Sequence, residues 1–489
     1  MPILATPPTM LSVVSAFPET SYTQQEMLEL LGVTNPVVKR LLQATHIHKR
    51  HLLLPTTKDF SFNTPPMSPS SFSGACLPLT PTSTDADSSV APSPRAELPV
   101  DAAELDMHFL PHAIAAASTA AGNDIQSTTS VGVNITPTST TTTTTPLPCA
   151  ALRKETRREL HMRHLRGLST IGADAARRAL TAAGITNMAS VSVVVAVTST
   201  GLAMPGFSAI LMEQLGLSPS TMRTDVVGMG CNAGMSGLRT LSMMLSGIAC
   251  MSSAPVYGLL VCCEICSAVY VNDDTTASGI VNSLFGDGAV ATVLTVGGSA
   301  STLPAADALL PLPATAGLLA SSTAAGAAWN GIGLVDFESC TLTEYFEDMR
   351  FDVPEEHDRM CFLLSKRIPY AVGDNVATPV LALLNRHQLT PQDVQHWVVH
   401  SGGAAVIDGV QRNLGLAPDA LRHTVSVLRD YGNISSGSFL VSLERLLEEH
   451  QQQLTGNNEV HPLLQKSQLV VFIAMGPGAT IEVGLGRLQ

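Results

Sequence analysis

The stretch VVGMGCNAGMSGLRTLSMM, residues 226–244, decides how the rest of the sequence is interpreted. Two valines precede its glycines, and small and apolar residues at a helical spacing follow Cys231. A thiol at the start of a helix feels the partial positive charge and unpaired N–H groups of that terminus, which favour thiolate. Free cysteine is also among the residue types most often buried for structural reasons. This stretch alone leaves both roles open.

Composition excludes several classes of protein. The chain has 489 residues, enough for two or three domains or for one large duplicated one. With 27 basic and 40 acidic side chains its net charge is -13, which argues against nucleic acids and anionic membranes as partners. Its nine cysteines lie scattered in apolar segments, and no run of 18 or more residues is consistently apolar. We therefore expect free thiols, no membrane span and a cytoplasmic location.

Two stretches of biased composition interrupt the chain. Residues 57–147 are rich in Ser, Thr, Pro and Ala, which predicts a disordered insertion because such a segment cannot bury enough apolar surface. Residues 301–335 form an Ala-rich insertion that contains the charge-free stretch from residue 308 onward. We expect 1–56 to begin an N-terminal half that continues over 148–300, and 336–489 to form a C-terminal half.

Outside these insertions, buried strands alternate with helices. VSVVVAVTST, which begins at Val191, is a continuous apolar run typical of a strand buried on both faces. The same alternation predicts a helix over 357–384 and further strands, at 256–271, 284–296, 396–403, 469–475 and 480–488. The pattern indicates an α/β fold of two comparable halves.

Two more residues in the second half suit catalysis. His400 ends an apolar strand and precedes Ser-Gly-Gly and a helix, a place where α/β sheets expose catalytic groups. Asn433 lies in the turn of DYGNISSGSF, just before another helix. Taken singly, each could be a structural hydrogen-bonding residue or a helix cap. Together with Cys231, they point to an active site.

Six motifs in order carry a resemblance to a known family. They are TSTGLAMPG, GMGCNAGMSGLR, SLFGDGAVATVL, HSGGAAVIDGVQRNLGL, YGNISSGSFLVSLE and MGPGATIEVGLGR. The chain resembles the type III polyketide synthases, the chalcone and stilbene synthase-like enzymes of the thiolase superfamily. The likeness covers about 9–56 and 150–489, apart from the insertions.

The resemblance implies a thiolase-like five-layer αβαβα fold, usually a homodimer, with an active site between the two halves. It implies that Cys231 accepts an acyl group from an acyl-CoA starter. It also implies that His400 stabilises the thiolate as an ion pair, and that His400 and Asn433 hold the enolate formed when malonyl-CoA loses carbon dioxide. No metal or redox cofactor is expected, because decarboxylation supplies the nucleophile.

Further positions match the family's substrate-binding residues. Phe285 and Phe362 resemble its two gatekeeper aromatics, although Phe285 could equally be a core residue. Arg40 resembles a phosphate contact, with a solvated helix face as the alternative. The other matches are Met204 as a residue that reaches the partner's cavity, Ser435 beside the catalytic centre, and Gly476, Pro477 and Gly478 at the cavity floor.

Some features depart from the plant enzymes or support no site. Cys266 and Val269 stand where those enzymes carry a polar strand, and Met229 replaces a glutamine, so we expect a less polar cavity. The stretch GMGCNAG is closer to the microbial branch and to the dihydroxyphenylacetate-forming synthases. The starter, the number of extensions and the cyclisation mode stay open.

Metal and nicotinamide chemistry find no support. Cys263 and Cys266 form a single C-x-x-C inside a predicted strand, without a second pair at zinc spacing. The clusters at 46–51 and 161–164, each with several histidines, lack an acidic or thiolate partner nearby. The GDG and GPG stretches do not have the dinucleotide-binding spacing.

Two alternatives to an iterative synthase stay open. A single-step 3-ketoacyl synthase of fatty-acid type would share the fold and the Cys, His and Asn. A non-catalytic thiolase-fold protein could use its Ser/Thr/Pro-rich insertion to bind partners. The presence of all three catalytic residue types argues against the second.

Overall fold

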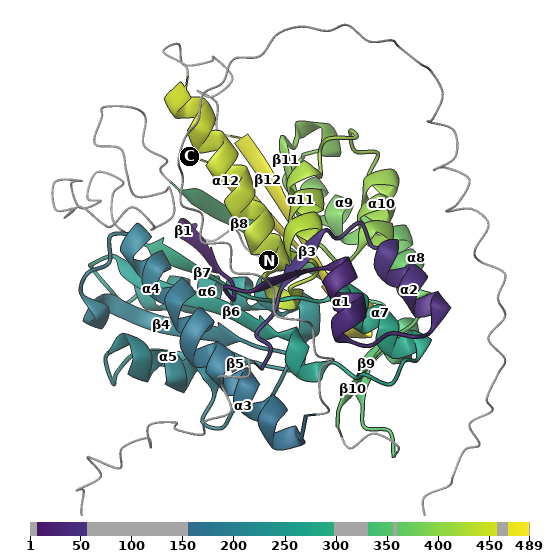
Figure 1. The fold of residues 1–489 in the computed structure, drawn as a ribbon. Helices are drawn as coiled ribbons and strands as arrows, with labels where there is room; N and C mark the ends of the chain where they lie inside the picture. The colour runs from purple at the N-terminus through teal and green to yellow at the C-terminus, as the bar shows by residue number, and fades with distance from the viewer. Residues whose placement is uncertain (1–6, 56–154, 298–330, 356–358, 457–467, 489) are drawn as a thin grey trace, which may run out of the picture. The chain divides into compact units, whose positions relative to one another are not determined.

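Strands from both ends of the chain belong to one sheet, in which β8 separates the N-terminal strand β1 from the C-terminal strand β13 (Figure 1). The computed structural model describes residues 7–55, 155–297, 331–355, 359–456 and 468–488, which belong to one compact unit. Within these ranges nine strands pair in the order β5-β4-β6-β7-β1-β8-β13-β12-β11. Their bounds are β1 Thr9–Ala16, β4 Val191–Val197, β5 Met222–Val226, β6 Val256–Ile265, β7 Asp287–Val296, β8 Ile332–Thr341, β11 His396–Val399, β12 Gln468–Gly476 and β13 Thr480–Leu488.

The two ends of this sheet repeat one pairing pattern. β4 pairs with β6 in parallel, whereas β6 with β7 and β7 with β1 are antiparallel. In the second half β11 pairs with β12 in parallel, whereas β12 with β13 and β13 with β8 are antiparallel. The halves join where Thr9 and Met10 of β1 pair with Gly333 and Ile332 of β8. The chain thus folds as two related halves.

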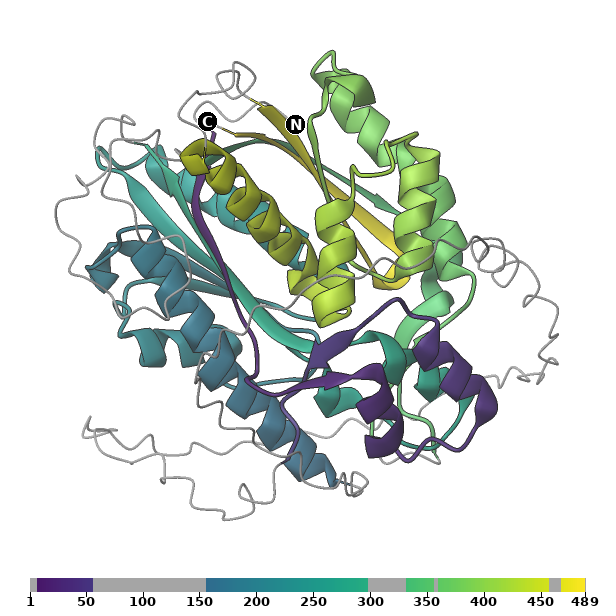
Figure 2. The same ribbon diagram turned by 45° about the horizontal axis from the view of Figure 1, so that its top comes forward.

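Two helices lie between the halves of the sheet. α6 (Ala233–Ala249) and α12 (Ser438–Gly456) share one hydrophobic core with strands of both halves. Figure 2 shows α12 between the teal strands of the first half and the yellow strands of the second. On the outer faces, α4 (Ala173–Ala182) and α5 (Phe207–Leu215) cover the first half, and α9 (Ala377–Arg386) and α10 (Ala404–Asn413) cover the second. The five layers of the predicted thiolase-like fold are therefore present.

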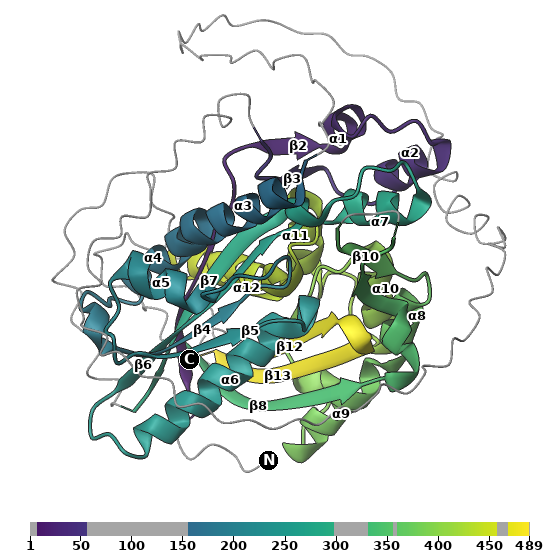
Figure 3. The ribbon, with the colours of Figure 1, turned by 90° about the horizontal axis from the view of Figure 1, so that it is seen from below.

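Shorter elements gather at one end of the two central helices (Figure 3). Their apolar side chains form a separate core that includes Cys231 and Phe285. The bounds of the remaining elements are β2 Ser21–Thr23, α1 Gln24–Leu30, α2 Pro36–Gln43, β3 Lys49–His51, α3 Arg157–Gly167, α7 Thr276–Leu284, β9 Met349–Asp352, β10 Cys361–Leu364, α8 Ile368–Asn375 and α11 Arg422–Tyr431. None of the described helices combines the length and apolar character that a membrane crossing requires.

Several predicted bounds differ from the structure. The predicted helix over 357–384 is wrong at its start, because Cys361–Leu364 forms strand β10, which pairs with β9. The strand predicted over 256–271 ends at Ile265. Of the two predicted insertions, 57–147 and 301–330 lie outside the described residues, but 332–335 belong to β8. The start of the predicted helix instead pairs with β9 in a hairpin, and the end of the predicted strand turns into a 3₁₀ helix, Cys266–Val269, two changes that local periodicity does not report.

Candidate active site

Cys231 lies where two glycine-rich segments meet. It sits in a 3₁₀ turn, Gly230–Asn232, that leads into α6, and its exposed fraction is 3%. Gly230 has φ +65°, a conformation that favours glycine, and a Cβ there would overlap the ring of Pro477. A Cβ at Gly476 would overlap Asn232. The turn that carries the thiol therefore packs closely against the GPG loop, and side chains at Gly230 or Gly476 would prevent this contact.

The start of the second central helix places polar groups against this thiol. Ser435 Oγ donates to Cys231 Sγ at 3.4 Å. Ser435 N donates to Asn433 Oδ1 at 2.8 Å, which leaves Nδ2 as the donor end of that amide. Asn433 N donates to Leu284 O at 2.8 Å, and Gly286 N donates to Asn433 O at 2.9 Å. These two bonds tie Asn433 to the end of α7 and to the segment that follows it.

His400 continues the ladder of β11 by one residue. Its backbone N donates to Ile473 O at 2.8 Å, and the side chain is 2% exposed. Its Nδ1 has no hydrogen-bond partner among the described residues. A Cβ at Gly402 would lie 3.1 Å from Cδ2 and 3.3 Å from Nε2 of the ring, closer than most such contacts. The imidazole thus occupies a slot that a glycine keeps open.

Burial controls the charge of both groups. It raises the pKa of the Cys231 thiol to about 12, an effect that the nearby Glu264 reinforces and that hydrogen bonds from Ser435 and Asn433 oppose. Burial also lowers the pKa of His400 to about 3. In the free protein the structure therefore favours an uncharged thiol and an uncharged imidazole, rather than the thiolate that the helix start was expected to stabilise.

Two cavities meet at Phe285. Cys231 and Ser435 line a small cavity of about 30 Å³, and His400 and Asn433 line a larger one of about 260 Å³. Phe285 is the one described residue that lines both. Phe285 therefore lies between the cavity of the thiol and the cavity of His400 and Asn433.

A fully buried arginine fixes the backbone of that phenylalanine. Arg50 donates from Nη1 to Phe285 O at 2.8 Å and to Asn282 O at 2.6 Å. Its Nη2 donates to Gln24 Oε1 at 2.8 Å, and Tyr270 OH also donates to Phe285 O. The sequence did not single out Arg50 for this role, because only its burial separates it from the neighbouring basic residues.

Three phenylalanines form an aromatic wall around the small cavity. The ring of Phe362, on β10, meets that of Phe285 edge to face, with centroids 5.7 Å apart. Phe351, on β9, lies with its centroid 5.1 Å from that of Phe362, and both line the cavity. Phe362 was predicted; Phe351 was missed, because the pairing of β9 with β10 brings it there.

Sequence reasoning also missed Glu264, a fully buried carboxyl near the thiol. It accepts from Ser199 N at 2.9 Å and from Thr200 Oγ1 at 3.1 Å, and Ser436 Oγ donates to its other oxygen. Burial raises its pKa to about 7, although these hydrogen bonds act against the rise. A single acidic residue inside the apolar run VYGLLVCCEICSAVYV was the available signal.

Of the remaining predicted positions, two line the cavities and three do not. Gly476 lines the larger cavity and Pro477 the smaller, but Gly478 lines neither. Met204 has an exposed fraction of 90%, so it does not contact the site of its own chain. Arg40 is exposed on α2, one residue before Leu41, which lines the larger cavity. The fold thus brings together eight of the eleven predicted site residues.

The described residues contain no group of three or more His, Cys, Asp or Glu side chains that could hold a metal ion. Cys263 and Cys266 are both buried and free, and the pKa of each thiol is raised well above its usual range by burial. His164 is buried near Thr200, 3.5 Å from its hydroxyl. Of Cys263, Cys266 and His164, only Cys266 lines the cavity of Cys231.

Fold and site together define a thiolase-like α/β protein with a buried cysteine between two related halves. The N-terminal domain model of chalcone and stilbene synthases matches residues 149–298, and the C-terminal domain model matches residues 349–487. The chain therefore belongs to the chalcone and stilbene synthase family, the type III polyketide synthases.

Curated relatives support the same assignment. The chain is 39% identical over 289 residues to the 3,5-dihydroxyphenylacetyl-CoA synthase of Streptomyces toyocaensis, an alignment that covers 59% of this chain and 64% of the relative. It is 31% identical over 309 residues to the acylalkylpyrone synthase csyB of Aspergillus oryzae, covering 60% and 67%. The chain thus spans less than two thirds of the length of the Streptomyces relative.

Solved structures share the fold. PKS-I from the brown alga Ectocarpus siliculosus has a TM-score of 0.65 and 20% identity, with 99% of each chain covered. The fungal type III polyketide synthase ORAS has a TM-score of 0.65 and 18% identity, with 99% of this chain and 100% of ORAS covered. At these identities, the likeness concerns the fold.

Proposed function

We propose that this chain is an iterative type III polyketide synthase, an acyltransferase that condenses malonyl-CoA with an acyl group on Cys231 and releases a small polyketide. The observation that carries the proposal is the place of Phe285. Phe285 lines the cavity of the thiol and also the cavity of His400 and Asn433. An acyl group in the first cavity and malonyl-CoA in the second would therefore lie on either side of Phe285.

In the loading step, Cys231 attacks the carbonyl carbon of the starter thioester. His400, uncharged at neutral pH, accepts the thiol proton as the new C–S bond forms. The bond to the coenzyme A sulfur breaks, and that sulfur takes the proton from His400. The hydrogen bond from Ser435 Oγ supports the charge that develops on Sγ during this transfer.

In the extension step, malonyl-CoA occupies the larger cavity. Its carboxylate leaves as carbon dioxide, and the electron pair of the broken C–C bond passes to the thioester as an enolate. Nδ2 of Asn433 and a ring N–H of His400 donate to the enolate oxygen. The enolate carbon then attacks the acyl carbon on Cys231, the C–S bond breaks, and the Cys231 sulfur leaves as a thiolate that takes a proton from water.

The size of the small cavity supports a short starter. A volume of about 30 Å³ holds on the order of two water-sized groups, which suits an acetyl-sized group better than an aromatic acyl group. Its wall includes the side chains of Cys266 and Val269, so it offers few polar contacts.

The proposal extends to assembly and location. Coenzyme A thioesters would be the substrates and no further cofactor would be required, since decarboxylation provides the carbon nucleophile. We propose a homodimer in which the exposed Met204 reaches the partner's cavity, and a cytoplasmic location, which the seven free cysteines of the described residues favour. Arg40 would contact the phosphates, and residues 57–147 would be dispensable for condensation.

Liquid chromatography with mass spectrometry tests the activity. Purified protein receives malonyl-CoA and a panel of acyl-CoA starters, beside Cys231→Ala and the control Cys250→Ala, which changes an exposed cysteine. We expect products with several added two-carbon units from wild type and control, and none from Cys231→Ala. A single extension would identify a 3-ketoacyl synthase instead, and a folded but inert wild type would favour an interaction protein.

A further inference from the structure

Two walls of the cavity around Cys231 come from segments far apart in the sequence. One wall is the turn after β6, which supplies Cys266 and Val269. The other is the hairpin of β9 and β10, in which Phe351 pairs with Phe362. The separation of these walls fixes how large a group the thiol can carry.

Strand β10 is held on both sides of Phe362. After the strand, Ser365 N donates to Asp348 O at 2.8 Å, which closes the hairpin on itself. Before the strand, Arg359 Nη2 donates to Glu155 O at 3.0 Å. The second bond leaves the hairpin and reaches the residues that begin α3, in the other half of the fold.

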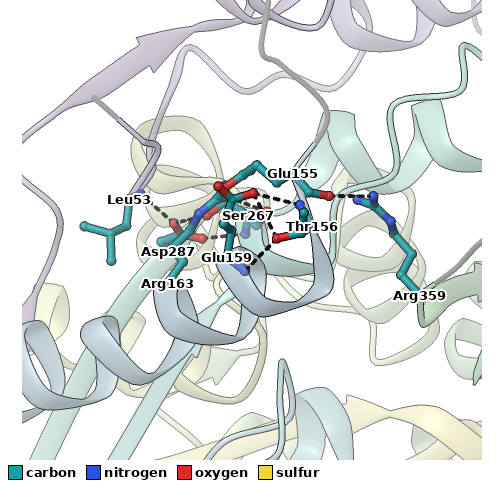
Figure 4. Close-up of polar contacts among 8 residues, drawn as sticks. All are labelled: Leu53, Glu155, Thr156, Glu159, Arg163, Ser267, Asp287 and Arg359. Carbon is teal, nitrogen blue, oxygen red and sulfur yellow. Dashed lines mark hydrogen bonds and ion pairs between the residues drawn. The ribbon is translucent and has the colours of Figure 1, made fainter. Parts of the chain in front are cut away.

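The start of α3 connects that bond to the opposite wall (Figure 4). The side chain of Glu155 forms an ion pair with Arg163, and both side chains are at least nine-tenths buried. Arg163 Nη1 donates to Ser267 O at 2.8 Å. Thr156 and Glu159 form a capping box that fixes the first turn of the helix.

Ser267 belongs to the turn that carries Cys266 and Val269. Its N and Oγ donate to the carboxyl of the fully buried Asp287, at 2.8 and 2.6 Å. Leu53 N also donates to Asp287, at 2.6 Å. One continuous polar path therefore runs from Arg359, beside the aromatic wall, to the turn that forms the other wall.

A buried ion pair is a poor source of stability, because desolvation of the two charges offsets most of their attraction. What such a pair does supply is geometry, since each charge must keep its partner in place. In this protein Glu155 and Arg163 lie between the two walls of one cavity. Their place fits a role in spacing the walls better than a role in holding the fold together.

We propose that Glu155, Arg163 and Arg359 form a positioning cluster that sets the separation of these walls and thereby limits the size of the acyl group on Cys231. None of the three touches the reacting atoms. The part of the proposal that concerns acyl groups rests on the proposed function, whereas the part that concerns the width of the cavity does not.

Alkylation of Cys231 tests the width directly. Iodoacetamide and iodoacetanilide carry the same reactive group, and the second adds a phenyl ring. Peptide mapping by mass spectrometry gives the rate for each cysteine, and the ratio of the two rates cancels the ionisation of the thiol. The variants are Arg359→Met, which keeps the stem but loses the donor, Arg359→Lys, which restores a donor, and the control Arg350→Ala on the same hairpin, which loses exposed ion pairs.

We expect Arg359→Met to raise the iodoacetanilide-to-iodoacetamide ratio at Cys231 by about fivefold, the change that corresponds to one lost hydrogen bond of ordinary strength. Arg359→Lys should restore most of the wild-type ratio, and Arg350→Ala should match wild type. With malonyl-CoA, Arg359→Met should shift products toward longer chains.

An unchanged ratio in folded Arg359→Met would overturn the proposal. So would a failure of Arg359→Met to fold while Arg359→Lys folds, because the contact would then serve stability. If the ratio changes as expected but the wild type makes no polyketide, the positioning cluster stands and the proposed function fails. If polyketides form but their lengths do not follow the ratio, the cluster does not limit the acyl group.

Discussion

The pH dependence of alkylation at Cys231 distinguishes a buried neutral thiol from a buried thiolate. Burial raises the pKa of this thiol to about 12, so about 1 in 10⁵ molecules carries the thiolate at pH 7. A cysteine in water, with a pKa near 8.5, is about 3% ionised at that pH. On ionisation alone, Cys231 should react about three thousand times more slowly than an ordinary thiol.

The assay is alkylation with iodoacetamide between pH 6 and 10, followed cysteine by cysteine with mass spectrometry. The exposed Cys250 serves as the internal control. The rate at Cys231 should rise about tenfold for each pH unit without a plateau, since its pKa lies above the range. Replacing His400 by Gln should change this profile little, because burial already keeps the imidazole uncharged.

A plateau at Cys231 with a midpoint near pH 6 or 7 would refute this reasoning. It would mean that the thiol and imidazole exchange a proton and stay as an ion pair in the free protein, as the resemblance implied. His400→Gln would then shift the midpoint upward by more than one pH unit. A slow rate with no plateau in both proteins would leave burial as the dominant effect.

Three further predictions concern residues around the site. Gly402→Ala should push the ring of His400 by a few tenths of an ångström and lower kcat on the order of tenfold. The control is Gly247→Ala, where an added Cβ meets nothing within 4 Å, and it should leave kcat unchanged. Equal kcat values in the two variants would show that catalysis does not need the slot. Burial raises the pKa of Glu264 from 4.5 to about 7, so the folded protein holds this proton more tightly than the unfolded chain does. The stability that this proton contributes is fully present below pH 4.5 and is lost as pH rises through 7, which should lower the free energy of unfolding by about 3 kcal/mol. Urea unfolding at pH 4.5 and 8 should show this loss in wild type and not in Glu264→Gln; a loss of the same size in both would assign it elsewhere. Phe285→Ala should join the two cavities and cost about 3 to 5 kcal/mol of stability. It should also raise the ratio of malonyl-CoA decarboxylated to malonyl-CoA condensed. An unchanged ratio in the folded variant would show that Phe285 does not act as a gatekeeper between the cavities.

Local sequence patterns determined much of this protein. The apolar run Val191–Val197 formed a buried strand, and Cys231 stands before a helix, as its flanking residues predicted. His400 follows the strand His396–Val399, and Asn433 lies in the turn before α12. These features depend on interactions between residues close in sequence, which periodicity and glycine placement report directly.

The tertiary structure alone decided which residues surround the thiol of Cys231 and whether that thiol is ionised. Phe351 joins the aromatic wall through the pairing of β9 with β10, and Glu264 approaches the thiol through the fold of the whole first half. Helix position favours a thiolate at Cys231, but burial raises its pKa to about 12. Desolvation depends on how completely distant segments exclude water from a group, and that is a property of the assembled fold rather than of its neighbours in sequence.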